Sequence, residues 1–76
     1  MSTQVMLPKL GFSMKEGTVA EWLVADGAAV QEGQAIYTLE SDKSAQEIES
    51  PATGTIRILK PAQELYQVGE VLAEID

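Results

Sequence analysis

Short stretches of alternating apolar and polar residues recur along the chain, and turn-forming residues separate them. In one such stretch Tyr37 follows Ile36 and Leu39 follows Thr38, so the pattern predicts a strand with Ile36 and Tyr37 on opposite faces. The pattern favours strands over helices throughout. We expect strands at Thr18–Val24, Gln34–Glu40, Ala45–Glu49, Thr55–Leu59 and Val71–Ile75, with another around Val5 and Leu7.

Glycine and proline residues punctuate the gaps between these segments, as tight turns require. We expect Gly17 and Gly54 to serve turns in which a side chain or a negative φ would interfere. Seven or eight short strands in 76 residues predict an all-β fold, a flattened barrel or sandwich, with residues 1–76 as a single domain. A chain this short has a thin core and little room for an enclosed active site.

An internal repeat divides the chain into two halves. Gly17-Thr18-Val19 reappears as Gly54-Thr55-Ile56, and residues 30–36 are echoed by residues 66–72. One half could not bury its own apolar face, so the repeat predicts two halves packed with near two-fold symmetry. The link between the halves would then lie at one end of the barrel and both termini at the other.

The composition argues against several classes of function. The chain has no cysteine and no histidine, so it lacks disulfides, the commonest zinc ligands and every Ser–His or Cys–His nucleophile pair. We therefore expect neither a metal site nor a self-sufficient enzyme. Twelve acidic against five basic residues give a formal net charge of −7, which disfavours nucleic-acid binding. This charge serves solubility, or it steers the domain toward basic surfaces on partner proteins.

The sequence contains no segment that would place the protein in a membrane. No apolar run approaches the roughly 20 residues that a spanning helix needs, and the first residues do not form a secretory signal. We expect a monomeric domain without membrane contact, located in the cytoplasm of a bacterium or in the mitochondrial matrix of a eukaryote.

The segment Ser41-Asp42-Lys43-Ser44 is typical of a β-turn between two strands. A lysine at such a turn points outward, and on spacing alone most such lysines are solvated surface. The carboxylates of Glu40, Asp42 and Glu47 favour the ammonium form of Lys43, whereas a Schiff-base or general-base lysine needs a lowered pKa. Lys43 therefore suits a group that another enzyme modifies.

Several motifs in sequence order carry a resemblance to a known family. They are Leu7-Pro8-Lys9-Leu10-Gly11, Glu16-Gly17-Thr18-Val19, Glu32-Gly33, Glu40-Ser41-Asp42-Lys43 and Ile48-Glu49-Ser50-Pro51-Ala52-Thr53-Gly54. In this order they resemble the lipoyl domain of the 2-oxo acid dehydrogenase dihydrolipoamide acyltransferases, from about Val5 to Asp76. The resemblance implies a flattened barrel of two four-stranded antiparallel sheets with quasi two-fold symmetry.

The resemblance also implies a role for Lys43, which would carry lipoate covalently as a swinging arm. A lipoate ligase or lipoyl transferase would attach the group and read the turn through Asp42 and Ser44, although alanine more often follows the lysine in this family. A thiamine-dependent 2-oxo acid decarboxylase would acylate the arm, an acyltransferase catalytic domain would pass the acyl group to coenzyme A, and dihydrolipoamide dehydrogenase would reoxidise it. The domain itself is then a non-catalytic carrier, because the chemistry belongs to the cofactor.

One loop corresponds to the surface that family members use to help the decarboxylase recognise its carrier. It consists of Leu10, Gly11, Phe12, Ser13, Met14, Lys15 and Glu16. Phe12 and Met14 are candidate contacts, and packing under the loop is their alternative role. Trp22 is expected to fill the core or to lie partly exposed beside it.

Two other functions stay open from the residues. A biotinyl domain shares the fold and the lysine, but biotin acceptors place methionine on both sides of it, so Asp42 and Ser44 favour lipoate. The other is an unmodified β-barrel that serves as a binding module. The sequence is compatible with pyruvate, branched-chain, 2-oxoglutarate and acetoin systems, and with either a fragment of a multidomain acyltransferase or a stand-alone carrier.

Overall fold

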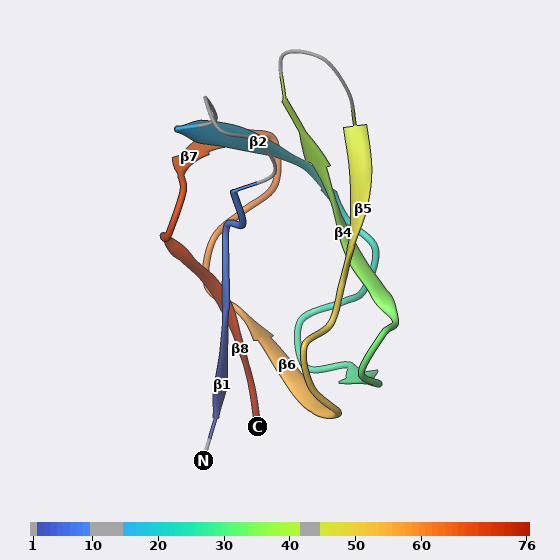
Figure 1. Ribbon diagram of the computed structural model, residues 1–76. Coiled ribbons are helices and arrows are strands. Elements are labelled where there is room, and N and C mark those ends of the chain that lie inside the picture. Colours follow the sequence, from blue (N-terminus) through green and yellow to red (C-terminus); the bar gives the residue numbers. More distant parts are fainter. Residues whose placement is uncertain (1, 10–14, 42–44) are drawn as a thin grey trace.

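The alternating segments form strands in the computed structural model, which describes residues 2–9, 15–41 and 45–76. Eight strands and no helix run through these residues (Figure 1). The strands are β1 (Thr3–Met6), β2 (Glu16–Trp22), β3 (Ala29–Val30), β4 (Ala35–Glu40), β5 (Ala45–Glu49), β6 (Gly54–Ile58), β7 (Glu64–Gln67) and β8 (Val71–Ile75).

The strands form two four-stranded antiparallel sheets, as the resemblance implied. One sheet has the order β1-β8-β6-β3 and the other has the order β5-β4-β2-β7. Each strand of one sheet corresponds to the strand four places away in the chain in the other sheet, so one half of the chain reproduces the other. This correspondence confirms the two-fold symmetry that the repeat predicted.

The symmetry extends to single hydrogen bonds. Gly33 and Gly69, at equivalent places in the repeat, have φ values of 89° and 94°. The Gly33 N–H donates to the Ser50 carbonyl at 2.9 Å, and the Gly69 N–H donates to the Leu7 carbonyl at 3.0 Å. Both turns need a backbone conformation that glycine adopts readily, which explains why the sequence repeats a glycine there.

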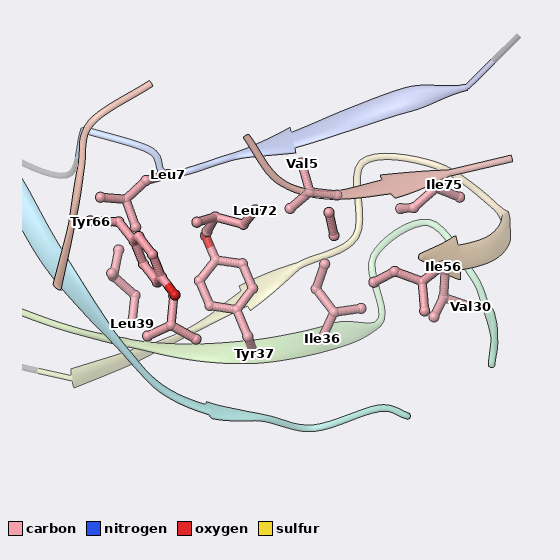
Figure 2. Packing of buried hydrophobic residues seen from close by; sticks show 12 residues of the cluster. Val5, Leu7, Val30, Ile36, Tyr37, Leu39, Ile56, Tyr66, Leu72 and Ile75 are labelled. Atoms are coloured by element: carbon pink, nitrogen blue, oxygen red, sulfur yellow. The ribbon is translucent and has the colours of Figure 1, made fainter. Parts of the chain in front are cut away.

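The core lies between the two sheets and draws side chains from both. Figure 2 shows Leu7, Tyr37, Leu72 and their neighbours facing one another across this space. The buried apolar residues are Val5, Leu7, Val19, Val30, Ile36, Tyr37, Leu39, Ile56, Tyr66, Leu72, Ala73 and Ile75. Trp22 is partly buried, as expected, and its ring lies 5.1 Å from that of Tyr37.

The expectation for Ile36 and Tyr37 was wrong, because both side chains are buried. The pairing of β4 with β5 shifts register between Ala35 and Tyr37. Such an irregularity breaks the strict alternation of faces along a strand, so two consecutive residues reach the core. An alternating pattern in the sequence does not reveal where a strand is irregular.

The two glycines that were assigned to turns lie in strands instead. Gly17 belongs to β2, and Gly54 begins β6. The prediction that bulk would interfere is confirmed at Gly54, because a Cβ there would collide with the backbone carbonyl of Asp76. Close approach of two strands, and no left-handed turn, explains this glycine.

The two ends of the barrel differ in what they carry. The start of β1 and the end of β8 pair with each other, through Thr3 opposite Ile75, so the two ends of the chain lie side by side. The end of β4 and the start of β5 lie at the other end of the molecule (Figure 1). The strands that lead into and out of the link between the halves thus end opposite the termini, as the repeat predicted.

Candidate functional site

The predicted attachment site falls in the connection of a β-hairpin. Glu40 at the end of β4 is paired with Ala45 at the start of β5, so the connection consists of residues 41–44. Asp42, Lys43 and Ser44 lie outside the described residues, and their assignment stays a prediction. The structure describes the two strands that bring the chain to this connection and away from it.

The strand that leads into the connection is anchored in the sheet and in the core. β4 is an inner strand, paired with β2 on one side and with β5 on the other. Leu39, next to the last residue of β4, is only 1% exposed, and its side chain belongs to the core. A strand that is paired on both sides and anchored by buried side chains provides a rigid base for the residues that follow it.

A tyrosine of β4 has an unusual environment. Tyr37 is buried, and among the described residues its hydroxyl oxygen has no hydrogen-bond partner. Burial raises the pKa of Tyr37 to about 12. This direction is expected because the low dielectric of the core disfavours the phenolate. Tyr37 therefore stays neutral and serves packing rather than acid–base chemistry.

The second buried tyrosine has partners. Tyr66 of β7 donates a hydrogen bond from its hydroxyl to the Pro61 carbonyl at 2.6 Å, and the same oxygen lies 3.2 Å from Glu64 Oε2. Burial, followed by the interaction with Glu64 and the charge of Glu70, raises the pKa of Tyr66. Neither buried tyrosine is poised to act as a general base near neutral pH.

The structure describes only the last two residues of the predicted partner loop, Lys15 and Glu16. Leu10, Gly11, Phe12, Ser13 and Met14 lie outside the described residues, so their role stays a prediction. Lys15 and Glu16 are exposed, and the Lys15 carbonyl accepts a hydrogen bond from Val68 at 3.0 Å. Because Thr18 of β2 lies opposite Glu40 of β4, the segment that leads into β2 approaches the hairpin end.

The two-fold symmetry marks this loop as an addition to one half. Leu7 and Ser50 occupy equivalent places, as do Gly17 and Gly54. Residues 8–16 separate the first pair of landmarks, whereas residues 51–53 separate the second pair. The first half is therefore longer at this point, and the longer segment contains the loop singled out in the sequence.

The string Ser-Pro-x-x-Gly has a structural role. Ser50 is 3% exposed and donates a hydrogen bond from its hydroxyl to the Ala52 carbonyl at 2.6 Å. The Ala52 N–H donates back to Ser50 Oγ at 3.4 Å. This small side-chain turn guides the chain from β5 into β6, where Gly54 packs against the backbone of Asp76.

Two further features of the described residues concern metal binding and a surface groove. No cluster of three or more His, Cys, Asp or Glu side chains among them could hold a metal ion. A shallow groove between β1 and β5 is almost entirely apolar, with Val5, Met6, Pro8, Ile48 and Pro51 among its lining residues. Glu49 is the one titratable side chain among the residues that line it. No helix in the described part of the chain is long and apolar enough to cross a membrane.

Comparison with known proteins places this fold in a family. Residues 3–75 match the biotin/lipoyl family model, whose description is "Biotin-requiring enzyme". The dihydrolipoyllysine-residue acetyltransferase component of the acetoin cleaving system of Cupriavidus necator is 43% identical over 68 residues, which cover 90% of this chain and 17% of that protein.

Two further relatives belong to other complexes. The acetyltransferase component of the pyruvate dehydrogenase complex of Zymomonas mobilis is 43% identical over 75 residues, 96% of this chain and 17% of that protein. The succinyltransferase component of the 2-oxoglutarate dehydrogenase complex of Bacillus subtilis is 34% identical over 73 residues, 95% of this chain and 18% of that protein. The chain spans less than a fifth of each of these relatives, and it belongs to the biotin/lipoyl attachment family.

Proposed function

We propose that this chain is a lipoyl carrier domain and that lipoate is attached through an amide bond to Lys43. The observation that carries the proposal is the position of Lys43 in the short connection between the paired residues Glu40 and Ala45, within a chain of the biotin/lipoyl attachment family. The relatives are acyltransferases that are named for a dihydrolipoyl-lysine residue. We therefore infer that lipoate is the attached cofactor and that Lys43 is the residue that carries it.

The hairpin suits a covalent group for a physical reason. Two paired strands on a rigid two-sheet base flank the connection that contains Lys43, and we expect a lysine there to hold its amine away from the body of the protein. Attachment forms a bond between Lys43 Nζ and the carboxyl carbon of an activated lipoyl donor, while the donor's leaving group departs and the amine loses a proton. Once bound, the dithiolane ring of lipoate supplies the acyl-transfer and redox chemistry that a chain without cysteine lacks.

The choice of lipoate over biotin rests on the neighbours of Lys43. Asp42 and Ser44 occupy the positions on either side of the lysine at which biotin acceptors have methionine. We expect the attaching enzyme, a lipoate ligase or lipoyl transferase, to recognise these two residues together with the geometry of the turn. Biotin would be a poor substitute, because its ligase meets a charged and a hydroxyl side chain in place of two apolar ones.

The carrier serves the enzymes of a 2-oxo acid dehydrogenase complex. A thiamine-dependent decarboxylase acylates the arm and contacts the loop of residues 10–16, an acyltransferase catalytic domain removes the acyl group, and dihydrolipoamide dehydrogenase reoxidises the arm. A tethered arm presents its group to each active site at a high effective concentration, so the intermediate need not diffuse away. Relatives from pyruvate, acetoin and 2-oxoglutarate systems all have sequences similar to this chain, so experiment has to identify the 2-oxo acid of its complex.

Mass spectrometry tests the attachment. The chain is incubated with lipoate, ATP and a lipoate ligase, and its intact mass and peptide map are measured. We expect one lipoyl-sized addition on Lys43, none in Lys43→Ala, and an unchanged fold in that variant. Lys60→Ala is the matched control, because Lys60 follows β6 and lies outside the connection between β4 and β5, and this variant should be modified like the wild type. Modification of Lys43→Ala, or addition of biotin by a biotin ligase, would overturn the proposal.

A further inference from the structure

A large apolar side chain lies exposed on the outer face of one sheet. Leu65 of β7 is 59% exposed, whereas its neighbour Tyr66 is buried at 6%. Successive side chains of a strand point to opposite faces, so Leu65 points away from the core. Leu65 belongs neither to the core among the described residues nor to the apolar side chains packed against it, and most of its surface is accessible to solvent.

Leu65 belongs to a row of residues that leads to the hairpin. Leu65 is paired with Thr18, Thr18 with Glu40, and Glu40 with Ala45. Paired residues of neighbouring antiparallel strands share a face of the sheet. Three strand spacings of about 4.8 Å place Leu65 about 14 Å from Ala45, at the start of the strand that follows Lys43.

The same face is strongly acidic. The strands of this sheet contain no lysine or arginine. The strands of the other sheet carry one cation and one anion, Arg57 and Glu74, which are paired across β6 and β8. The register and the alternation of faces place five exposed glutamates around the row that contains Leu65, and we call this surface the acidic sheet face: Glu16, Glu21, Glu40, Glu47, Glu49 and Leu65.

The charge of this face restricts what can cover it. Nucleic acids, anionic membranes and a second copy of the same face would all be repelled. A protein surface that presents lysine or arginine side chains around an apolar contact matches both features, since leucine offers contact area and glutamates offer complementary charge. Because the face reaches the hairpin, such a protein would lie over the residues that lead to Lys43.

We propose that the acidic sheet face is the docking surface for a basic surface of the enzyme that attaches lipoate to Lys43. The inference rests on the proposed function. The attaching enzyme has to hold the bare lysine at its own active site, so it must cover the strands that carry the hairpin. The other enzymes of the complex receive an arm that already extends beyond the domain, and they need less contact with the sheet.

The test compares two variants with the same change of charge. Glu21→Gln with Glu47→Gln removes two charges from the acidic sheet face, on either side of Thr38 and away from the hairpin connection. Glu32→Gln with Glu74→Gln removes two charges outside the strands of this sheet. Leu65→Thr removes the apolar contact with a residue that strands favour. Circular dichroism and thermal unfolding establish that each variant is folded.

The measurement is the initial rate of lipoylation by a lipoate ligase, followed by intact mass at several concentrations of the chain and of sodium chloride. In the Glu21/Glu47 variant we expect an about tenfold lower kcat/KM at low salt, through a higher KM with an unchanged kcat. The difference should shrink at high salt, where exposed charges are screened. Leu65→Thr should raise KM at every salt concentration, and the Glu32/Glu74 variant should stay within about twofold of the wild type.

Each other outcome overturns a defined part of the argument. A wild-type chain that the ligase does not modify at Lys43 would overturn the proposed function and the docking surface together. Normal modification of the wild type with an unchanged KM in the Glu21/Glu47 variant would overturn the docking surface alone. An equal rise of KM in the Glu32/Glu74 variant would also overturn it, because the ligase would then respond to net charge and not to this face.

Discussion

Tyr37→Phe removes a single oxygen atom from the core and should make the domain more stable. The Tyr37 side chain is 0% exposed, and its hydroxyl has no hydrogen-bond partner among the described residues. Leaving a buried polar group unsatisfied costs about 1–3 kcal/mol, which phenylalanine would avoid. The gap left behind is on the order of 10 Å³, and at about 24 cal/mol per Å³ it offsets only about 0.2 kcal/mol of this gain.

Tyr66→Phe is the matched control, since Tyr66 is also buried but donates its hydroxyl to the Pro61 carbonyl. It should lose about 1 kcal/mol, because a satisfied hydrogen bond disappears and the Pro61 carbonyl loses a donor. Urea denaturation followed by tryptophan fluorescence gives both free energies of unfolding, provided that the m-value is unchanged. Thermal unfolding should move by about 4–8 °C per kcal/mol in a domain of this size. Equal destabilisation by both substitutions would refute the reasoning, because the Tyr37 hydroxyl would then have a partner.

Further predictions concern pH and three glycines. Because the pKa of Tyr37 is raised to about 12, the folded chain keeps a proton that the unfolded chain loses near pH 10, so the free energy of unfolding should fall by about 3 kcal/mol between about pH 10 and 12. Urea titrations across this range should show a smaller fall in Tyr37→Phe. Gly54→Ala should cost about 3 kcal/mol by thermal unfolding, since its Cβ meets the Asp76 carbonyl; a normal stability would mean that the strands can separate there. Gly33→Ala and Gly69→Ala should each cost about 1–2 kcal/mol, and markedly unequal losses in denaturant would contradict the equivalence of the two turns.

The internal repeat was the most informative feature of the sequence. It predicted the two-fold relation of the halves, and β5 and β8 have the bounds that the alternating pattern gave them. Strand β2 begins earlier than expected, at Glu16, because Glu16 and Gly17 pair with β7. The alternating pattern predicts no strand at β3 or β7, whose short lengths leave little alternation to detect. Partners far away in the sequence decide such boundaries.

Part of the candidate site could also be predicted from the sequence and part could not. The hairpin on which Lys43 lies follows from the pattern of Gln34–Glu40 and Ala45–Glu49, and the structure confirms strands on both sides of residues 41–44. The lipoyl assignment depended on the resemblance, because an exposed lysine at a turn is ordinary by itself. The acidic sheet face was missed, since its residues come from strands that are distant in sequence and only the register of β2, β4, β5 and β7 brings them together. Four strands without a lysine or arginine were the available signal.

The pairing of Thr3 with Ile75 has a consequence for any longer polypeptide that contains this domain. In such a polypeptide, segments before β1 and after β8 would both leave the domain at the same pole. The domain would then be attached through that pole alone. The end of β4 and the start of β5, which flank the hairpin connection, lie at the opposite pole (Figure 1), and the molecule is 31 Å long and 20 Å across. The body of the domain thus acts as a rigid spacer that adds to the radius a tethered group can sweep. A longer or stiffer linker at this pole would change the radius that the tethered group can sweep, and it would stay away from the end where modification is proposed.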